Sequence, residues 1–141
     1  MLPLANITVK GGGTINGGDL ASQIKRITNA CDAEILAATK EAGKIVSENT
    51  ARNLRATSPK RSGAAYAKSW KAKFLGGTEY VVYNEKHYRL THLLENGHDL
   101  ISHGKKVGRV KAYPHIKKAE TRAIEEYIDE VTKEVNRRLG Q

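Results

Sequence analysis

A long periodic pattern of apolar residues is the feature of this sequence that most constrains its fold. Apolar side chains recur every three or four residues from Leu20 to Leu54, and the pattern ends at Ser58-Pro59. This spacing places them on one face of an amphipathic helix, and proline cannot continue a helix interior. The sequence therefore predicts one long helix from residue 19 to residue 57.

The segment after the proline has the alternation of a small antiparallel sheet. Trp70, Ala72 and Phe74 alternate with two lysines, and a glycine-rich turn precedes a second strand at residues 79–84. Alternate side chains of a strand point to opposite faces, so residues 70–84 predict a hairpin. Residues 88–96 predict a short helix that Gly97 ends, residues 98–106 a polar loop, and residues 107–112 a third strand.

A second apolar stripe predicts a C-terminal helix from Ile116 to Leu139, with Pro114 in its first turn. Together these elements predict an α+β fold. A long N-terminal helix and a C-terminal helix would pack on an antiparallel sheet of about three strands, with a short middle helix. Residues 1–18 are rich in glycine and are expected to form a flexible arm, and residues 19–141 a single domain.

Positive charge is concentrated in the middle of the chain. The net charge is +9, and residues 52–118 hold fifteen Lys or Arg against four Asp or Glu. A basic segment of this size attracts polyanions through counterion release, and it equally suits a solvated face that keeps a protein soluble. Both interpretations remain open, and non-specific contact with DNA belongs to the first. The candidate DNA-facing residues are Lys60, Arg61, Lys68, Lys71, Lys73, Lys105, Lys106, Arg109 and Lys111.

Residues typical of catalytic and metal sites do not occur in the required patterns. Cys31 is the single cysteine, and none of the five histidines is paired at the spacing of a helical metal site. The run Gly11-Gly12-Gly13-Thr14 lacks the lysine of a phosphate-binding loop. No apolar run approaches the roughly 18 residues that a membrane span needs. We therefore expect no enzyme, no metal, no cofactor and no membrane segment.

Glu95, which lies two residues before Gly97, has two interpretations. Its carboxylate can accept hydrogen bonds from backbone N–H groups of the adjoining loop or pair with Arg61 or Arg109, and so act as a structural tie. Alternatively, it contacts a partner directly. A turn at Ser62-Gly63 is expected to be architectural, because glycine permits a positive φ and serine can bond the local backbone.

Three blocks of the sequence resemble the phage neck and tail-completion proteins, a family of tail components and head-tail joining proteins of long-tailed phages. The blocks are a Pro-x-x-Ser-Gly turn, a stretch from Tyr88 to His98 that contains Leu-Glu-x-Gly-His, and the aromatic-proline step at Tyr113. The resemblance covers residues 19–139. The matching residues assigned to structure or interface are Pro59, Ser62, Gly63, Tyr83, Asn84, Tyr88, Leu94, Glu95, Gly97, His98 and Pro114.

The resemblance implies a structural protein of the virion that acts at the neck or tail, in head-tail joining or tail completion, and is not an enzyme. It implies other neck, connector and tail proteins as partners, a homo-oligomeric ring around the DNA path, and a place in the host cytoplasm during assembly. Two alternatives remain open. One is a small basic nucleic-acid-binding protein, with or without nuclease activity, and the other is a minor capsid-associated protein.

Overall fold

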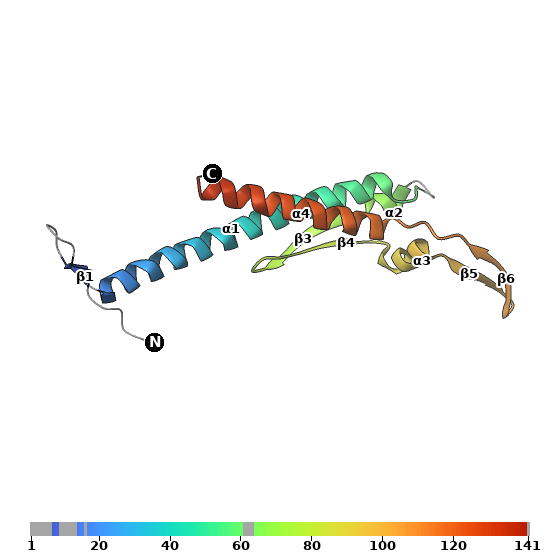
Figure 1. Cartoon of the computed structure of the whole chain (residues 1–141). Coiled ribbons are helices and arrows are strands. Elements are labelled where there is room, and N and C mark those ends of the chain that lie inside the picture. The colour runs from blue at the N-terminus through green and yellow to red at the C-terminus, as the bar shows by residue number, and fades with distance from the viewer. Residues whose placement is uncertain (1–6, 9–13, 16, 61–63, 141) are drawn as a thin grey trace. The chain divides into compact units, whose positions relative to one another are not determined.

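The computed structural model describes residues 7–8, 14–15, 17–60 and 64–140, which form helices and two-stranded sheets (Figure 1). The elements in chain order are β1 (Ile7–Thr8), β2 (Thr14–Ile15), α1 (Gly17–Thr57), α2 (Ala65–Lys68), β3 (Trp70–Gly76), β4 (Glu79–Asn84), the 3-10 helix η2 (Tyr88–Leu90), α3 (Thr91–Asn96), β5 (His98–Ser102), β6 (Lys105–Val110) and α4 (Ile116–Arg138). The α+β class predicted from the sequence is confirmed.

The chain divides into two compact units, Met1–Ala37 and Ala38–Gln141. In the first unit β1 and β2 pair antiparallel, with Ile7 opposite Ile15, and α1 begins at Gly17. Most of the arm predicted for residues 1–18 lies outside the described residues. The division of the chain at residue 18 therefore stays a prediction.

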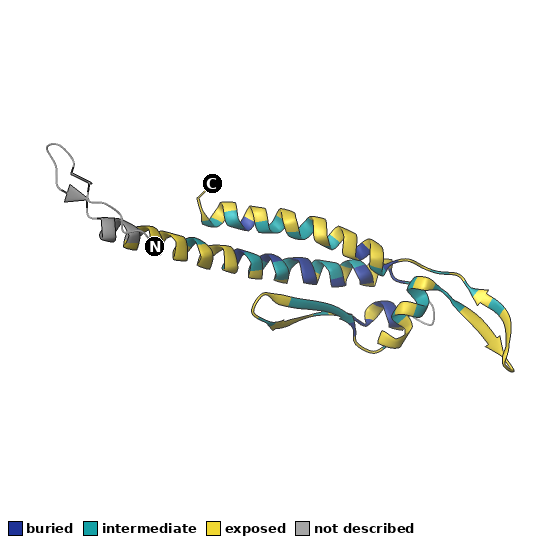
Figure 2. Ribbon diagram, turned by 60° about the horizontal axis from the view of Figure 1, so that its bottom comes forward, coloured by how far each residue is buried: buried dark blue, intermediate teal, exposed yellow. Residues whose placement is uncertain are grey.

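The apolar stripe of α1 is buried only in its second half. In the second unit Ala38, Ala42, Val46 and Leu54 are between 0% and 6% exposed. In the first unit the apolar side chains of α1 are largely exposed, and they are Ile24, Ile27, Ile35 and Leu36. Figure 2 shows this change of burial along the helix. One sequence pattern thus supplies both a core face and an uncovered apolar face.

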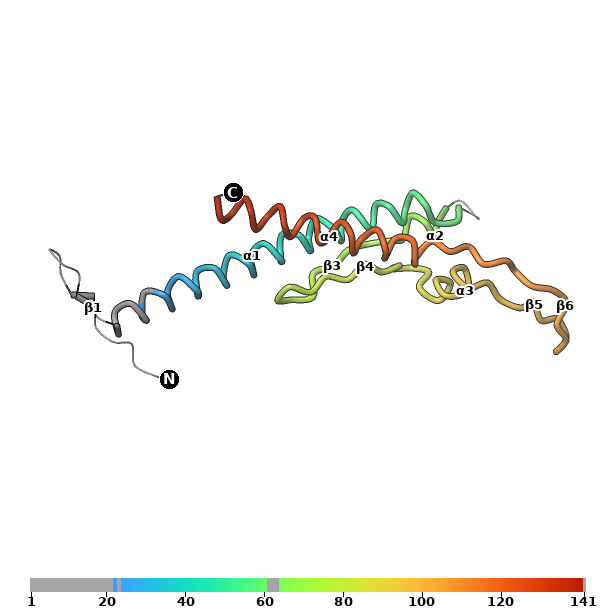
Figure 3. The backbone as a smooth tube through the Cα atoms, viewed as in Figure 1, coloured from blue at the N-terminus to red at the C-terminus, as the bar shows by residue number. Residues whose placement is uncertain are grey.

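In the second unit, α4 lies alongside the C-terminal half of α1 (Figure 3), and Asn49 Nδ2 donates to Glu126 Oε1 at 2.5 Å. The core at this end contains Leu54, Tyr66, Trp70 and Ala119, and three half-buried side chains pack against it. Those three are Val82, Leu94 and Ile116. The core therefore joins α1, α2, β3, β4, α3 and α4 at one place.

The hairpin β3–β4 forms as the alternation of apolar residues predicts. Trp70 pairs with Asn84 and Ala72 with Val82 in an antiparallel register. Gly43 of α1 permits a close approach to this hairpin, since a Cβ built on it would lie 2.9 Å from Cδ2 of Tyr80. The absence of a side chain at position 43 therefore lets the aromatic ring of β4 lie against the helix.

The loop before the third predicted strand, and the sheet that this strand was expected to join, were predicted incorrectly. Residues 98–106 do not form a polar loop, because His98–Ser102 is strand β5 and pairs antiparallel with β6. The strand predicted at residues 107–112 is β6, and it pairs with β5 instead of β3 or β4. Among the described residues the strands form two-stranded sheets only, so the expected three-stranded sheet does not occur.

A two-residue turn explains this difference. His103 and Gly104 lie between paired Ser102 and Lys105, and both have positive φ, 51° and 75°. Such mirror-image turns match the twist of the flanking strands and join them tightly. Histidine tolerates the left-handed region better than most side chains, but it is a weaker turn signal than asparagine or aspartate.

Candidate functional site

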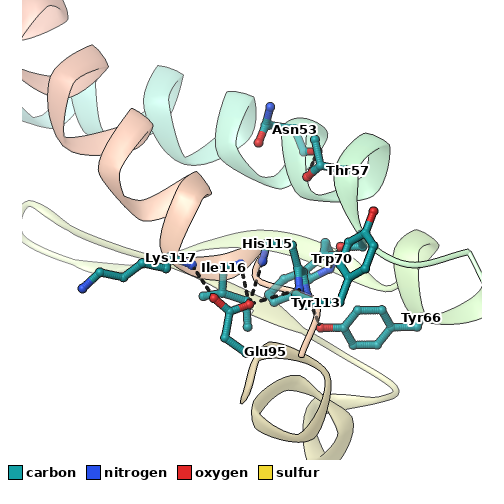
Figure 4. A network of polar contacts seen from close by, with 10 residues as sticks. Asn53, Thr57, Tyr66, Trp70, Glu95, Tyr113, His115, Ile116 and Lys117 are labelled. Carbon is teal, nitrogen blue, oxygen red and sulfur yellow. Dashed lines mark hydrogen bonds and ion pairs between the residues drawn. The ribbon is translucent and has the colours of Figure 1, made fainter. Parts of the chain in front are cut away.

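Glu95, the last residue but one of α3, holds the start of α4. Its Oε2 atom accepts hydrogen bonds from the backbone N–H groups of His115 and Ile116, both at 2.8 Å, and its Oε1 atom accepts one from Lys117 at 2.9 Å (Figure 4). The first N–H groups of a helix have no partner within the helix. A carboxylate from a separate element therefore supplies the cap that α4 lacks in its own sequence.

The capping bonds also stabilise the charged form of Glu95. Partial burial of the carboxyl raises its pKa, but the three backbone hydrogen bonds and the nearby imidazole of His115 outweigh this effect. The net result is a pKa of Glu95 below its ordinary value. The carboxylate is thus ionised at neutral pH, and its negative charge lies at the positive end of the α4 dipole.

His115 connects Glu95 to Tyr66 of α2. Its Nδ1 atom lies 2.7 Å from the carbonyl oxygen of Tyr113 and 3.1 Å from Oε2 of Glu95, and its Nε2 atom lies 2.7 Å from the Tyr66 hydroxyl. Because both neighbours of Nδ1 are acceptors, we assign a hydrogen to Nδ1. In the neutral imidazole, Nε2 then accepts the hydrogen bond that Tyr66 donates.

The network is enclosed by aromatic rings. The ring of Tyr66 meets those of Trp70 and His115 edge to face, with centroids 5.9 and 5.6 Å apart. Burial, and secondarily the charge of Glu95, raises the pKa of Tyr66 to about 12. The phenol of Tyr66 therefore keeps its hydrogen. Beside it, Nε1 of Trp70 donates a hydrogen bond to Oγ of Ser58, just after the end of α1, at 2.8 Å.

Asn84 and Gly97 complete the join, by which we mean the buried contacts of Tyr66, Glu95 and His115 that connect α2, α3 and α4. Asn84 is 2% exposed, and it donates to the carbonyl of Tyr66 at 2.9 Å while accepting from the backbone N–H of His87 at 2.9 Å. Gly97 has φ 71° and lies so close to the next segment that a Cβ there would be 2.5 Å from the carbonyl oxygen of Val110. Both residues fix the backbone around α3.

The carboxylate of Glu95, the imidazole of His115 and the phenol of Tyr66 form a row of hydrogen-bonded groups. Such a row can occur in a catalytic site, but here its geometry suits a structural role. His115 is 2% and Tyr66 6% exposed, and each polar atom of the row already has a partner within the protein. A phenol with a raised pKa is a poor nucleophile at neutral pH, because little of it is ionised. The geometry favours a fixed hydrogen-bonded tie between three elements, α2, α3 and α4.

The structure brings only part of the predicted motif into this join. The motif residues that lie in the join are Asn84, Leu94, Glu95 and Gly97. Pro114 immediately precedes His115 in the sequence. Tyr83 is half-buried on β4, and Tyr88 is 59% exposed at the start of η2. His98 begins β5, and its Nδ1 atom is buried with no hydrogen-bond partner in the described part of the chain. Pro59 follows α1, whereas Arg61, Ser62 and Gly63 lie outside the described residues.

Three of the candidate DNA-facing cations are paired with carboxylates. Lys71 lies 2.7 Å from Glu85, while Lys106 and Arg109 both contact Asp99, at 3.0 and 2.9 Å. These two cations hold the pKa of Asp99 below its ordinary value. Pairing reduces the charge that each offers to a polyanion, so β3 and β5–β6 carry less free positive charge than their sequence indicates.

Removing the Tyr66 hydroxyl tests the row. We expect Tyr66→Phe to lower the free energy of unfolding by about 1–2 kcal/mol, because the buried Nε2 of His115 loses its partner. Urea denaturation monitored by tryptophan fluorescence measures this change. Tyr88→Phe is the matched control, since its exposed hydroxyl only accepts from Arg89 Nε at 3.3 Å, and it should change stability by less than about 0.5 kcal/mol. Equal effects of the two variants would show that the row contributes nothing specific.

The described residues contain neither a metal-binding cluster nor a membrane-spanning helix. No group of three His, Cys, Asp or Glu side chains there is arranged to hold a metal ion. None of the described helices has the length and apolar character needed to cross a membrane.

Comparison with known proteins gives one family match. The model of the family described as "Bacteriophage HK97-gp10, putative tail-component" matches residues 18–97. This segment runs from α1 to Gly97, so it includes Asn84 and Glu95 and ends before Pro114 and His115. Searches of curated proteins and of solved structures gave no match.

Proposed function

The chain belongs to the HK97-gp10-like family of bacteriophage tail components, and on this premise we propose that it is a structural subunit of the phage neck or tail that acts in head-tail joining or tail completion. Its place would be the virion, after assembly in the host cytoplasm. Its partners would be other neck, connector and tail proteins. The proposal assigns the protein to assembly rather than to catalysis.

The observation that carries this proposal is the amount of apolar side-chain surface left exposed. Soluble monomers rarely expose contiguous apolar patches, and such patches mark interaction surfaces. On α1 the exposed fractions of Ile24 and Ile27, which lie one turn apart on the same side of the helix, are 52% and 64%. Further exposed apolar residues lie on other elements, namely Leu100, Ile101 and Val107 on β5–β6 and Ile124 and Ile128 on α4. Covering them requires another protein surface.

The buried join supports the same proposal. A subunit that assembles must present its contact surfaces in a fixed geometry, since ordering flexible elements opposes association. Glu95 caps α4, and its neighbour His115 bonds to α2, so several elements are held around one core. We propose that this rigid body forms a homo-oligomeric ring around the DNA path, with its apolar faces against neighbouring subunits.

A charge placed on the uncovered face of α1 tests the proposal. We expect the wild-type chain to form oligomers, or to co-assemble with neck or tail proteins of its phage, and Ile27→Asp to weaken this association about tenfold or more. Burial of one isoleucine contributes roughly 1.5–3 kcal/mol, and aspartate would instead bury a charge. Light scattering over a range of concentrations, followed by negative-stain imaging, measures the assembly.

The control is Asn29→Asp, which adds the same charge to an exposed position two residues away on α1. Because two residues turn a helix by about 200°, position 29 lies on a different face from position 27. The control should assemble like the wild type. A wild-type chain that remains monomeric and does not co-assemble with tail or connector proteins would contradict the proposal.

A further inference from the structure

A basic cavity lies between the C-terminal end of α1 and the segment that leads into α4. Its volume is about 950 Å³, and it is lined by four cationic residues, Lys60, Lys111, Lys118 and Arg122. Among the described residues that line it, none carries a carboxylate. Two of the four, Lys118 and Arg122, come from α4 and were not among the cations selected from the sequence. Only the fold brings them to Lys60 and Lys111.

These four cations have no ion-pair partner among the described residues, unlike three of the cations on the strands. Lys71, Lys106 and Arg109 are each paired with a carboxylate. Unpaired cations that line one concavity repel one another, and this repulsion is relieved when an anion binds between them. The cavity therefore brings together four cations whose charge no ion pair in the described part of the chain offsets.

The cavity also offers neutral groups suited to a phosphate ester. Asn53 and Thr57 of α1 line it, and Figure 4 shows them above the segment that carries Tyr113 and His115. The amide of Asn53 is the donor suited to a phosphate oxygen, since the Thr57 hydroxyl donates to the carbonyl of Asn53 at 2.9 Å. Tyr113, another lining residue, is 50% exposed. The backbone N–H groups at the start of α4 are already bonded to Glu95, so the attraction for an anion comes from the side chains.

We propose that this cavity binds the phosphate groups of a nucleic-acid strand. Several cations spaced around a large open cavity suit consecutive phosphates, and an exposed aromatic ring beside them can stack on a base. An acidic peptide would use the cations but not the ring. The choice of nucleic acid rests on the proposed place of the protein beside the DNA path, whereas the binding itself needs no assembly.

Fluorescence anisotropy with labelled DNA of about 12 nucleotides, as single strand and as duplex, at about 50 and 200 mM salt tests the site. The pocket variant is Lys111→Gln with Lys118→Gln, and the matched control is Lys44→Gln with Lys86→Gln. All four lysines are exposed, and the control pair lies outside the cavity. We expect the pocket variant to bind about tenfold or more weakly at the lower salt concentration, with the salt slope reduced by about 1.4–1.8 for two lost phosphate contacts.

The control should retain most of the wild-type affinity, and all variants should unfold at the same urea concentration as the wild type. Equal weakening in the two variants would overturn the proposal, because binding would then follow net charge alone. Absence of binding by the wild type to either DNA would overturn it too. The proposal would also be overturned if inorganic phosphate or an oligoglutamate peptide displaced the labelled DNA as effectively as unlabelled DNA does. Light scattering of the same variants separates failure of this site from failure of assembly.

Discussion

Replacing Gly97 by alanine is expected to lower the free energy of unfolding by about 3 kcal/mol or more. Gly97 follows α3 with φ 71° and ψ 172°, a region of backbone space that only glycine adopts readily. A Cβ at this position would also lie 2.5 Å from the carbonyl oxygen of Val110 and 2.8 Å from the backbone nitrogen of Ala112. Backbone strain and a steric clash therefore act together.

The control for this variant is Gly104→Ala. Gly104 has a similar φ of 75°, but a Cβ there would meet nothing within 4 Å, so only strain of about 1 kcal/mol is expected. Urea denaturation of both variants separates the two contributions. If both variants lose the same stability, the close approach of residues 110–112 to Gly97 does not occur in solution.

Removing the Glu95 carboxylate is expected to have the second large effect. Glu95→Ala leaves three backbone N–H groups at the start of α4 without their acceptor and removes one of the two acceptors of His115 Nδ1, and we expect a loss of about 3 kcal/mol. Glu95→Gln keeps one acceptor oxygen but removes the charge, so its loss should be smaller, about 1–2 kcal/mol.

The stability contributed by Glu95 depends on pH in a defined direction. Its pKa in the folded protein lies below the value of about 4.3 for an unfolded chain, so its contribution is fully present above that value. It is lost as the pH falls through the folded pKa. Glu95→Gln should therefore flatten the acid limb of the stability profile. Glu85→Gln, which removes an exposed partner of Lys71, should leave that limb nearly unchanged.

The helices could be predicted from the sequence because their signals are long. The predicted range 19–57 differs from Gly17–Thr57 by two residues at its start. The C-terminal helix begins at Ile116, so Pro114, which was predicted to lie in its first turn, precedes the helix. A stripe repeated over many turns outweighs local exceptions. Strand β5 was missed because its two apolar residues, Leu100 and Ile101, are adjacent, so no alternation of apolar side chains indicates a strand there.

The role of Glu95 was predicted in kind but not in detail. Acceptance of backbone hydrogen bonds was one interpretation, and the structure shows the donors to be the first residues of α4. Arg109 pairs with Asp99 instead, and Arg61 lies outside the described residues. The contact between Tyr66 and His115 joins residues 49 positions apart, and no periodicity reports such a pair. The role of the motif residues as an interface stays a prediction.

The central claim is that Glu95 and its neighbours form a structural tie that positions α4 within an assembly subunit. Amide hydrogen exchange of His115, Ile116 and Lys117 in the wild type and in Glu95→Gln tests it most directly. We expect these three amides to be protected in the wild type and to exchange about tenfold or more faster in the variant, which corresponds to about 1.4 kcal/mol. Unchanged protection in Glu95→Gln would contradict the claim.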